Sequence, residues 1–406
     1  MTKTRDELLA LLSRDSALVE LQKLLKEELL PPTGDEVNIH IHTTYSGSPY
    51  PPTAAVYFAR RAGLGVCGLM DDLSIAGAEE FLQAAAIAGM HATVGMACRV
   101  HMKGTPFAGR RLNSPHQEGV AWMSLHAVPH DRMHGLNDRF APFREKRLVR
   151  MRQQTEAANA LLLQHGLAIS FERDVLPLSN CTVGGSVTSQ HIACAIACRL
   201  LEMVGSGEAL AAFIREGLAM PLAGEEEQRL RGAGCMDALA GWVRGAFLPR
   251  IRVEATDELP DVREALGLCN EAGAIPAYAY VGGEAFEDGC LDALLPYLKG
   301  LGFRAVTCRP SRNSRAQLER LRALCGQCGL LLLSGEGVCQ LGQPFLCEAQ
   351  RDVAYRSLTD AAWALAAHEW RATADAQNGL FSTESVKKWP DLRERVRVFA
   401  LQGRKL

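Results

Sequence analysis

The sequence predicts an α/β protein built as a barrel of β/α units, and two observations favour this class. Strand and helix patterns alternate along much of the 406-residue chain, as they do in repeated β/α units. About seven strand patterns are present, and polar candidates for a functional site follow several of them, as at the carboxyl ends of barrel strands. An open parallel sheet is the other arrangement that such repeats form.

The first part of the chain is expected to hold one helix and then four strands. Apolar residues have helical spacing over 4–30, and Pro31 and Pro32 end this helix. The predicted strands are 37–43, 65–71, 91–100 and 119–127. The predicted helices after the first two strands are 52–63 and 76–89.

A mainly helical region interrupts this alternation. A long charged helix is predicted over 142–166, and the pattern stays helical from about 187 to 246. The alternation then resumes, with helices at 260–273, 288–301 and 314–328, strands at 275–281, 303–308 and 329–334, and a last helix at 359–375. The expected domains are an N-terminal helical segment (1–34), two parts of the barrel (35–135 and 259–350), a helical insertion (136–258) and a C-terminal helical segment (351–406).

Composition limits the classes of function and the compartment. The net charge of −2 gives no basic field, so nucleic acid is not an expected partner. No apolar run reaches the ~18–20 residues of a membrane span, and no secretory signal opens the chain. Thirteen cysteines without a framework spacing predict reduced thiols and a cytoplasmic protein, in which the CxxC of Cys325 and Cys328 is two unrelated thiols. The oligomeric state is left open.

The most distinctive stretch is "VNIHIHTTYSGS" at 37–48. Residues two apart on a strand point to the same face, so His40 and His42 present two imidazoles side by side. Such a pair can bind a divalent cation, or it can be part of an ordinary polar strand face. No glycine-rich nucleotide motif and no GxSxG elbow accompanies it.

Three blocks of sequence resemble the polymerase and histidinol phosphatase (PHP) family. They are "IHIHTTYSGS", "GLGVCGLMDDLSIAG" and "TVGMACRV", and "VTSQHIACAIA" and "LLLSGEGVCQ" fall where later ligands of that family are expected. The resemblance covers about 36–200 and 260–350. It implies a distorted seven-stranded β/α barrel, similar to a TIM barrel, with a two- or three-metal centre that hydrolyses phosphate esters.

The resemblance implies that several residues of this chain correspond to metal ligands of the family. His40 and His42 match the first pair, and His126 matches a later histidine, with His130 as its competitor. His191 matches another histidine; alternatively, it lies in a capped first helical turn. Asp71 matches the aspartate of the second motif and is expected to act as the catalytic base or to orient a ligand.

Other positions depart from the family. Gly47 and Ala97 replace an aspartate and the bridging glutamate, and Gly337 and Cys339 replace the closing aspartate and histidine. Asp72 replaces a ligand histidine. Cations about 3.5–4 Å apart need carboxylates between them, so a reduced metal set is expected. It comprises one divalent ion (Zn²⁺ or Mn²⁺) on His40, His42 and some of Asp72, His126, His191 and Cys339, or no metal at all.

An anion site is predicted independently of any metal. Arg309 and Arg312 lie in "TCRPSRNS", where a strand ends and a helix begins, so they suit a phosphate group. The alternative is a capped helix with two solvated arginines. Three functions follow from these patterns: a phosphoesterase acting on a small phosphorylated metabolite, an inactive PHP relative that binds a ligand or partner, and a structural zinc protein.

Overall fold

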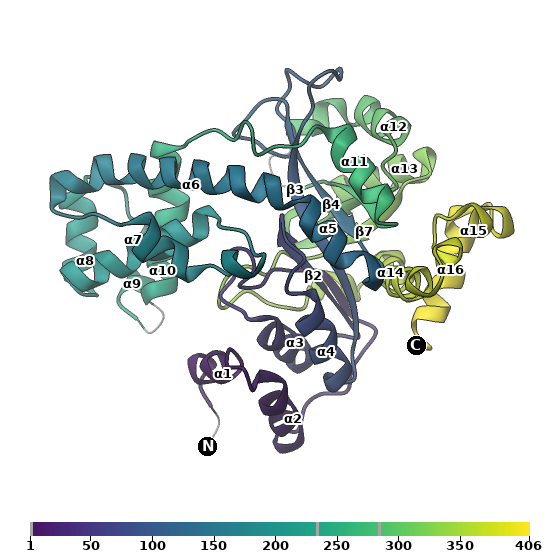
Figure 1. The fold of residues 1–406 in the computed structure, drawn as a ribbon, viewed down its shortest axis with the longest axis horizontal. Helices are drawn as coiled ribbons and strands as arrows, with labels where there is room; N and C mark the ends of the chain where they lie inside the picture. Colours follow the sequence, from purple (N-terminus) through teal and green to yellow (C-terminus); the bar gives the residue numbers. More distant parts are fainter. Residues whose placement is uncertain (1–2, 233–234, 283–285) are drawn as a thin grey trace. The chain divides into compact units, whose positions relative to one another are not determined.

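The computed structural model describes residues 3–232, 235–282 and 286–406, which form two compact units (Figure 1). The sheet unit comprises the chain up to Thr43, Pro49–Phe140 and Leu259–Leu406. The helical unit comprises Thr44–Ser48 and Ala141–Glu258. Among the described residues, none of the helices combines the length and the apolar character needed to cross a bilayer.

Seven strands form one sheet in which the spatial order follows the sequence. Their bounds are β1 Val37–Ile41, β2 Val66–Asp72, β3 His91–His101, β4 Val120–His126, β5 Ile275–Ala279, β6 Ala305–Cys308 and β7 Leu331–Ser334. All seven lie at the predicted places. The sheet is mixed and not parallel throughout, because β4 is antiparallel to both β3 and β5. The chain passes from β3 to β4 without the crossover helix that a parallel pair requires.

The sheet curls into a half-barrel, and the segment after β7 returns to β1. Val338 forms a parallel bridge with Ile41. The Val338 amide donates to the His40 carbonyl over 3.1 Å, and the His42 amide donates to the Val338 carbonyl over 3.0 Å. This contact joins the two edges of the sheet near the carboxyl end of β1, whereas complete closure into a barrel stays a prediction.

Helix α14 covers one face of the sheet, which we call the α14 face. Helix α14 spans Arg356–Ala374 and is buried on nearly every side, with alanines at the contacts. The strand residues that form the cluster with α14 and α16 (Leu392–Gly403) are Val37, Ile39, Val66, Ile275, Ala277, Ala305, Leu331 and Leu333. A Cβ at Gly403 of α16 would lie 2.2 Å from the Trp363 carbonyl oxygen, so glycine permits this close helix crossing.

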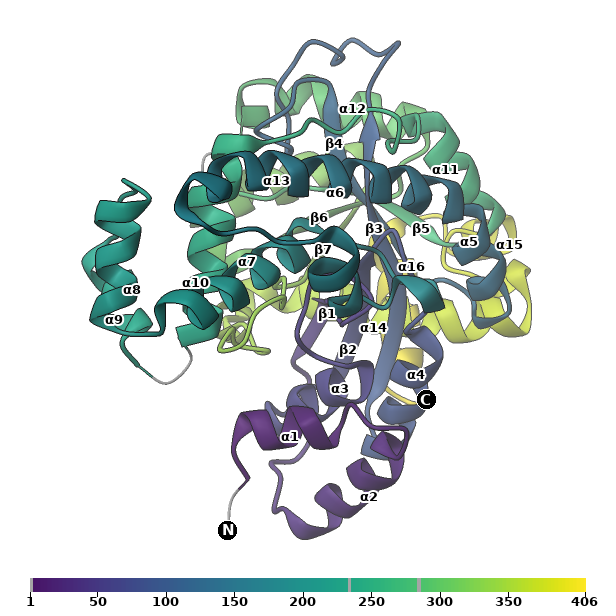
Figure 2. The same ribbon diagram turned by 60° about the vertical axis from the view of Figure 1, so that its left-hand side comes forward.

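The remaining helices of the sheet unit are α1 Arg5–Leu11, α2 Ala17–Glu27, α3 Pro52–Arg61, α4 Ala78–Ala88, α5 Met133–Arg139, α11 Val262–Glu271, α12 Leu291–Leu301, α13 Arg315–Cys328 and α15 Thr383–Lys388 (Figure 2). The helix predicted over 4–30 is therefore two helices. The Ser13 hydroxyl donates to the Leu9 carbonyl over 2.8 Å at the break, where a serine competes with the helical backbone.

The helical unit has a core of its own. Its helices are α6 Ala141–Leu162, α7 Ser189–Val204, α8 Glu208–Ala212, α9 Gly224–Leu230 and α10 Cys235–Trp242. Their shared core includes Met151, Ile192, Ile196, Leu210 and Trp242. The described residues of 142–246 contain no strand.

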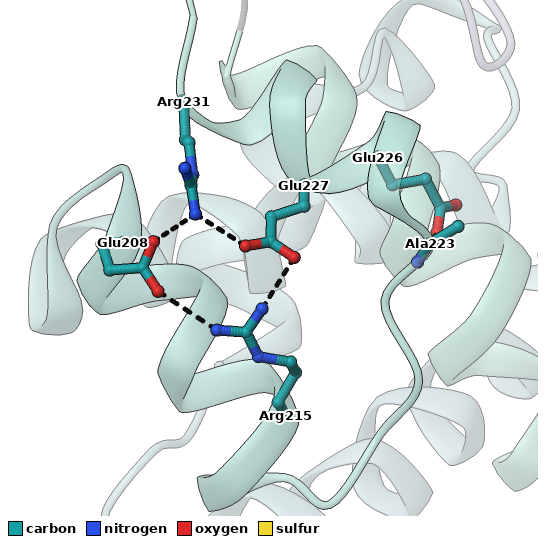
Figure 3. A network of polar contacts seen from close by, with 6 residues as sticks. All are labelled: Glu208, Arg215, Ala223, Glu226, Glu227 and Arg231. Carbon is teal, nitrogen blue, oxygen red and sulfur yellow. Dashed lines mark hydrogen bonds and ion pairs between the residues drawn. The ribbon is translucent and has the colours of Figure 1, made fainter.

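Two sets of ion pairs hold parts of the helical unit together. On its surface, Glu208, Arg215, Glu227 and Arg231 form a closed ring (Figure 3), in which Arg215 lies 2.7 Å from Glu227 and 3.1 Å from Glu208. Each such exposed pair contributes about 0–1 kcal/mol and is screened by salt. In the interior, the buried carboxylate of Glu258 receives two hydrogen bonds from Arg150 of α6, at 2.6 and 2.9 Å.

Candidate functional site

The strand register decides which predicted residues share a face. Ala97 of β3 is level with Asp72 of β2 and with Ser124 of β4. Ser124 is in turn level with Ala277, which packs in the α14 cluster. Residues at one level of a sheet point to the same side, so Asp72, Ala97 and Ser124 belong to the α14 face. His126, two residues after Ser124, points to the same face.

An irregularity in β1 brings His40 to this face. The register between β1 and β2 shifts between Asn38 and Ile41. Beyond the shift Ile41 is level with Leu69, which shares its face with Asp71. His40 therefore points to the opposite side from Asp71, toward the face that holds Asp72 and His126.

Burial lowers the pKa of two imidazoles on this face. Desolvation of the half-buried ring lowers the pKa of His40, and electrostatic interactions with Arg309, His42 and His126 lower it further. Burial lowers the pKa of His126 to about 3, and its Nε2 lies 2.9 Å from the Ser124 hydroxyl. The ring centres of His40 and His42 are 5.0 Å apart. Three predicted histidines and Arg309 are thus close enough to interact electrostatically.

Arg309 is the permanent charge of this group. It follows β6 directly and is half-buried, whereas Arg312 is exposed on the next turn. No described residue forms an ion pair with the Arg309 guanidinium or accepts a hydrogen bond from it. Desolvation and the charge of Arg312 lower the pKa of Arg309, while Cys339, Glu336 and Asp72 act in the opposite direction. Glu336 itself accepts hydrogen bonds from the Ser311 amide and hydroxyl, at 2.9 and 2.5 Å.

Gly337 provides the space in which this guanidinium lies. A Cβ at position 337 would be 2.7 Å from Arg309 Nη2 and 2.9 Å from its Cζ. Gly335 has a similar relation to His40, because a Cβ there would lie 2.7 Å from the His40 Cβ. The glycines after β7 therefore let the returning chain pass closely over the predicted site residues.

Asp71 lies on the other face of the sheet. Its two carboxylate oxygens accept hydrogen bonds from the Thr43 amide at 2.6 Å and from the Thr43 hydroxyl at 2.5 Å, and the side chain is fully buried. Asp71 thus holds the residue that follows His42. This contact fits the predicted orienting role better than that of a base, and a role in catalysis stays a prediction.

The other predicted ligands have different surroundings. His191 belongs to the helical unit, where its Nδ1 accepts a hydrogen bond from the Thr188 amide over 3.0 Å at the start of α7. Burial lowers the pKa of His191 to about 4. Cys339 is half-buried beside Arg309, and its amide donates to Gln343 over 2.6 Å. The ligand roles of both residues stay predictions.

Two further positions are explained by their contacts. His130 is bound to Glu369 of α14 over 2.9 Å, which gives it a structural contact of its own. A Cβ at Gly47 would lie 2.8 Å from the Thr188 hydroxyl, so an aspartate would not fit there without movement. Ser124 is a site residue that the sequence reasoning missed, although its place two residues before His126 on a strand was the available signal.

The residues of the site do not fit the metal cluster that the family resemblance implies. Within the described part of the chain, no three His, Cys, Asp or Glu side chains converge as ligands of one ion. Ala97 offers no bridging oxygen, and the guanidinium of Arg309 lies against Gly337, where the resemblance places a carboxylate. We therefore derive no chemical step through a metal cluster.

Comparison with known proteins gives structural matches alone. No protein-family model matches the chain, and a search of curated proteins finds no match. One similar structure is a protein of Bifidobacterium adolescentis provisionally described as a metal-dependent phosphoesterase. It is 19% identical, with a TM-score of 0.50 over 78% of this chain and 93% of that one.

A second structure is an amidohydrolase from Chromobacterium violaceum, with bound sulfate and no metal. It is 15% identical, with a TM-score of 0.51 over 79% of this chain and 95% of that one. At these identities the likeness shows a shared fold. The chain therefore has an α/β fold with a curled, barrel-like sheet, as these two structures do.

Proposed function

We propose that the chain is a divergent relative of the PHP phosphoesterases that binds a small phosphorylated molecule at the end of the α14 face. The observation that carries this proposal is Arg309, a half-buried guanidinium without a carboxylate partner among the described residues, placed beside the imidazole of His40. Arginine presents several N–H donors in a planar fork, which matches the oxygens of a phosphate group.

The surroundings support an anion as the ligand. Ala97 adds no negative charge to that of Asp72, which is level with it on this face, and both carboxylate oxygens of Glu336 are bound by Ser311. The neutral imidazoles of His40 and His126 offer hydrogen bonds without adding charge. The amidohydrolase of similar fold was itself solved with bound sulfate and no metal.

Titration with inorganic phosphate and with a phosphate monoester tests this proposal. Arg309→Ala should weaken binding by about 1.5–3 kcal/mol, because a charged hydrogen-bond donor is removed from a desolvated position. Isothermal titration calorimetry measures the affinity. Arg315→Ala is the matched control, because Arg315 is an exposed cation that pairs with Glu319. Equal affinity of the wild type and Arg309→Ala would contradict the assignment.

Hydrolysis of the bound ester is a second candidate function, with a single divalent ion as the expected cofactor. The observation in its favour is the pair of His40 and His42, with ring centres 5.0 Å apart. Release of nitrophenol from an aryl phosphate, measured with and without Mn²⁺ or Zn²⁺, separates an enzyme from a protein that only binds. The described residues supply no third ligand beside this pair.

A further inference from the structure

The guanidinium of Arg309 occupies space that is open because residue 337 is a glycine. The guanidinium lies where any side chain at position 337 would begin, with Nη2 2.7 Å and Nη1 3.2 Å from the place of a Cβ. An aspartate at 337 would require the guanidinium to shift from its present place. Where the family resemblance implies an acidic ligand at position 337, this chain has a glycine, and the Arg309 guanidinium lies against it. The chain therefore places a cation where an acidic ligand is implied.

The charge of Arg309 reaches the predicted metal ligands. On either side of Gly337 the chain contacts His40: a Cβ at Gly335 would lie 2.7 Å from the His40 Cβ, and the Val338 amide donates to the His40 carbonyl over 3.1 Å. Asp72 and Cys339, two further predicted ligands, interact with the same guanidinium. A divalent cation bound among these side chains would be repelled by a fixed positive charge at close range.

We propose that the guanidinium of Arg309, housed by Gly337, replaces a metal ion at this site and makes phosphate binding independent of divalent metal. This inference rests on the proposed function and deepens it, because it names the source of the positive charge. A metal ion and a guanidinium both neutralise phosphate oxygens, but the guanidinium is supplied by the folded chain itself.

Phosphate titrations of the full-length protein in EDTA, and again with one equivalent of Mn²⁺, test this inference. The wild type should bind phosphate with the same affinity in both. Arg309→Ala and Gly337→Ala should each bind at least tenfold more weakly in EDTA, since the first removes the guanidinium and the second displaces it. Gly300→Ala should bind like the wild type, because the exposed Gly300 has open space around its Cβ position.

The outcomes separate the inference from the proposed function. Phosphate binding by the wild type that disappears in EDTA would overturn the inference and leave the proposed function standing. Absence of phosphate binding under both conditions would overturn both. Full affinity in Gly337→Ala together with a loss in Arg309→Ala would show that Gly337 does not house the guanidinium. The wild-type comparison requires no variant, so it decides the metal question even if Gly337→Ala fails to fold.

Discussion

At the scale of single residues, the two aspartates of "LMDD" have different roles because a strand turns successive side chains to opposite faces. Asp72 points to the α14 face near Arg309, while Asp71 points away and binds Thr43. Sequence reasoning placed both at one site. The direction of Asp71 relative to His40 depends on the register shift in β1, and nothing in the residue pattern indicates that shift.

Removal of the Asp71 charge tests its role as a support for the strand end. Asp71→Asn should lower the free energy of unfolding by about 1–3 kcal/mol, because an amide cannot accept from both donors of Thr43 with equal strength. Urea denaturation measures the change. Thr43→Val removes the hydroxyl and keeps the amide, so it should lower the free energy of unfolding by less than Asp71→Asn does. Unchanged stability of Asp71→Asn would show that these hydrogen bonds contribute little.

At the scale of elements, α14 carries two adjacent buried ionisable residues with opposite responses to pH. The His368 Nδ1 accepts from the Leu380 amide at 2.8 Å, and burial lowers the pKa of His368 to about 4. The Glu369 carboxylate accepts from the Val94 amide at 2.8 Å and contacts His130, and burial raises its pKa to about 7. His368 is therefore uncharged at neutral pH, whereas Glu369 titrates close to neutral pH.

The two residues should therefore change the stability of the protein in opposite pH ranges. In the unfolded chain His368 binds a proton below pH 6.5, whereas in the folded chain it stays neutral down to about pH 4. The free energy of unfolding therefore decreases as the pH falls through this range. In the unfolded chain Glu369 loses its proton above pH 4.5, whereas in the folded chain it keeps the proton up to about pH 7. The free energy of unfolding therefore decreases as the pH rises through this range. His368→Gln should lose less stability than the wild type from pH 7 to 4.5. Glu369→Gln should lose less from pH 5 to 8.

We expect each difference to be about 1–3 kcal/mol, from chemical denaturation at a series of pH values. His130 contacts Glu369, and this contact raises the pKa of His130, so His130 adds to the effect of Glu369 in the same direction. Curves that run parallel to the wild type for both variants would show that these groups titrate alike in the folded and unfolded chain.

The elements also show how far the sequence predicts the fold. All seven strands could be predicted, because short apolar runs bounded by turn residues mark them. The antiparallel direction of β4 could not, since pairing direction is set by the path of the chain between residues 101 and 120. Helix α14 was expected near 359–375. Its packing across the sheet was not expected, because its many alanines give only a weak periodic pattern of hydrophobicity.

The candidate site was also only partly predictable from the sequence. Residue type and place single out the imidazole pair, His126 and Arg309 as candidates, and their roles stay predictions. Their approach to one another, and the space that Gly337 leaves for the guanidinium, depend on how the chain returns past β1 after β7. The contact of Ile41 with Val338 joins residues almost 300 positions apart, so a local pattern cannot reveal it.

At the scale of the whole molecule, the thirteen cysteines form no disulfide in the described part of the chain, and among them only Cys198 is exposed. Six are buried, namely Cys67, Cys98, Cys269, Cys308, Cys325 and Cys347. Burial raises the pKa of Cys67 and Cys325 to about 12 and that of Cys347 to about 11, so these thiols form little reactive thiolate. The folded chain is thereby protected from thiol oxidation over much of its interior.

Native thiol titration with a chromogenic disulfide should therefore show a fast phase at Cys198 and no reaction at the six buried thiols. Those six should become reactive as denaturant unfolds the chain, at the midpoint found by circular dichroism. Cys198→Ser should remove the fast phase without changing the midpoint. Rapid reaction of more than seven thiols in the folded protein would contradict the burial described above.

The position of α14 in the chain sets the order in which the protein is completed during synthesis. β1 leaves the ribosome more than 300 residues before the end of α14, the helix that covers its apolar side chains. At ~5–20 residues per second, this interval is about 15–70 seconds. Throughout it, the growing sheet presents uncovered valine, isoleucine and leucine to the cell. Translation of α14 therefore ends the period in which the nascent chain is most exposed to aggregation and to capture by chaperones.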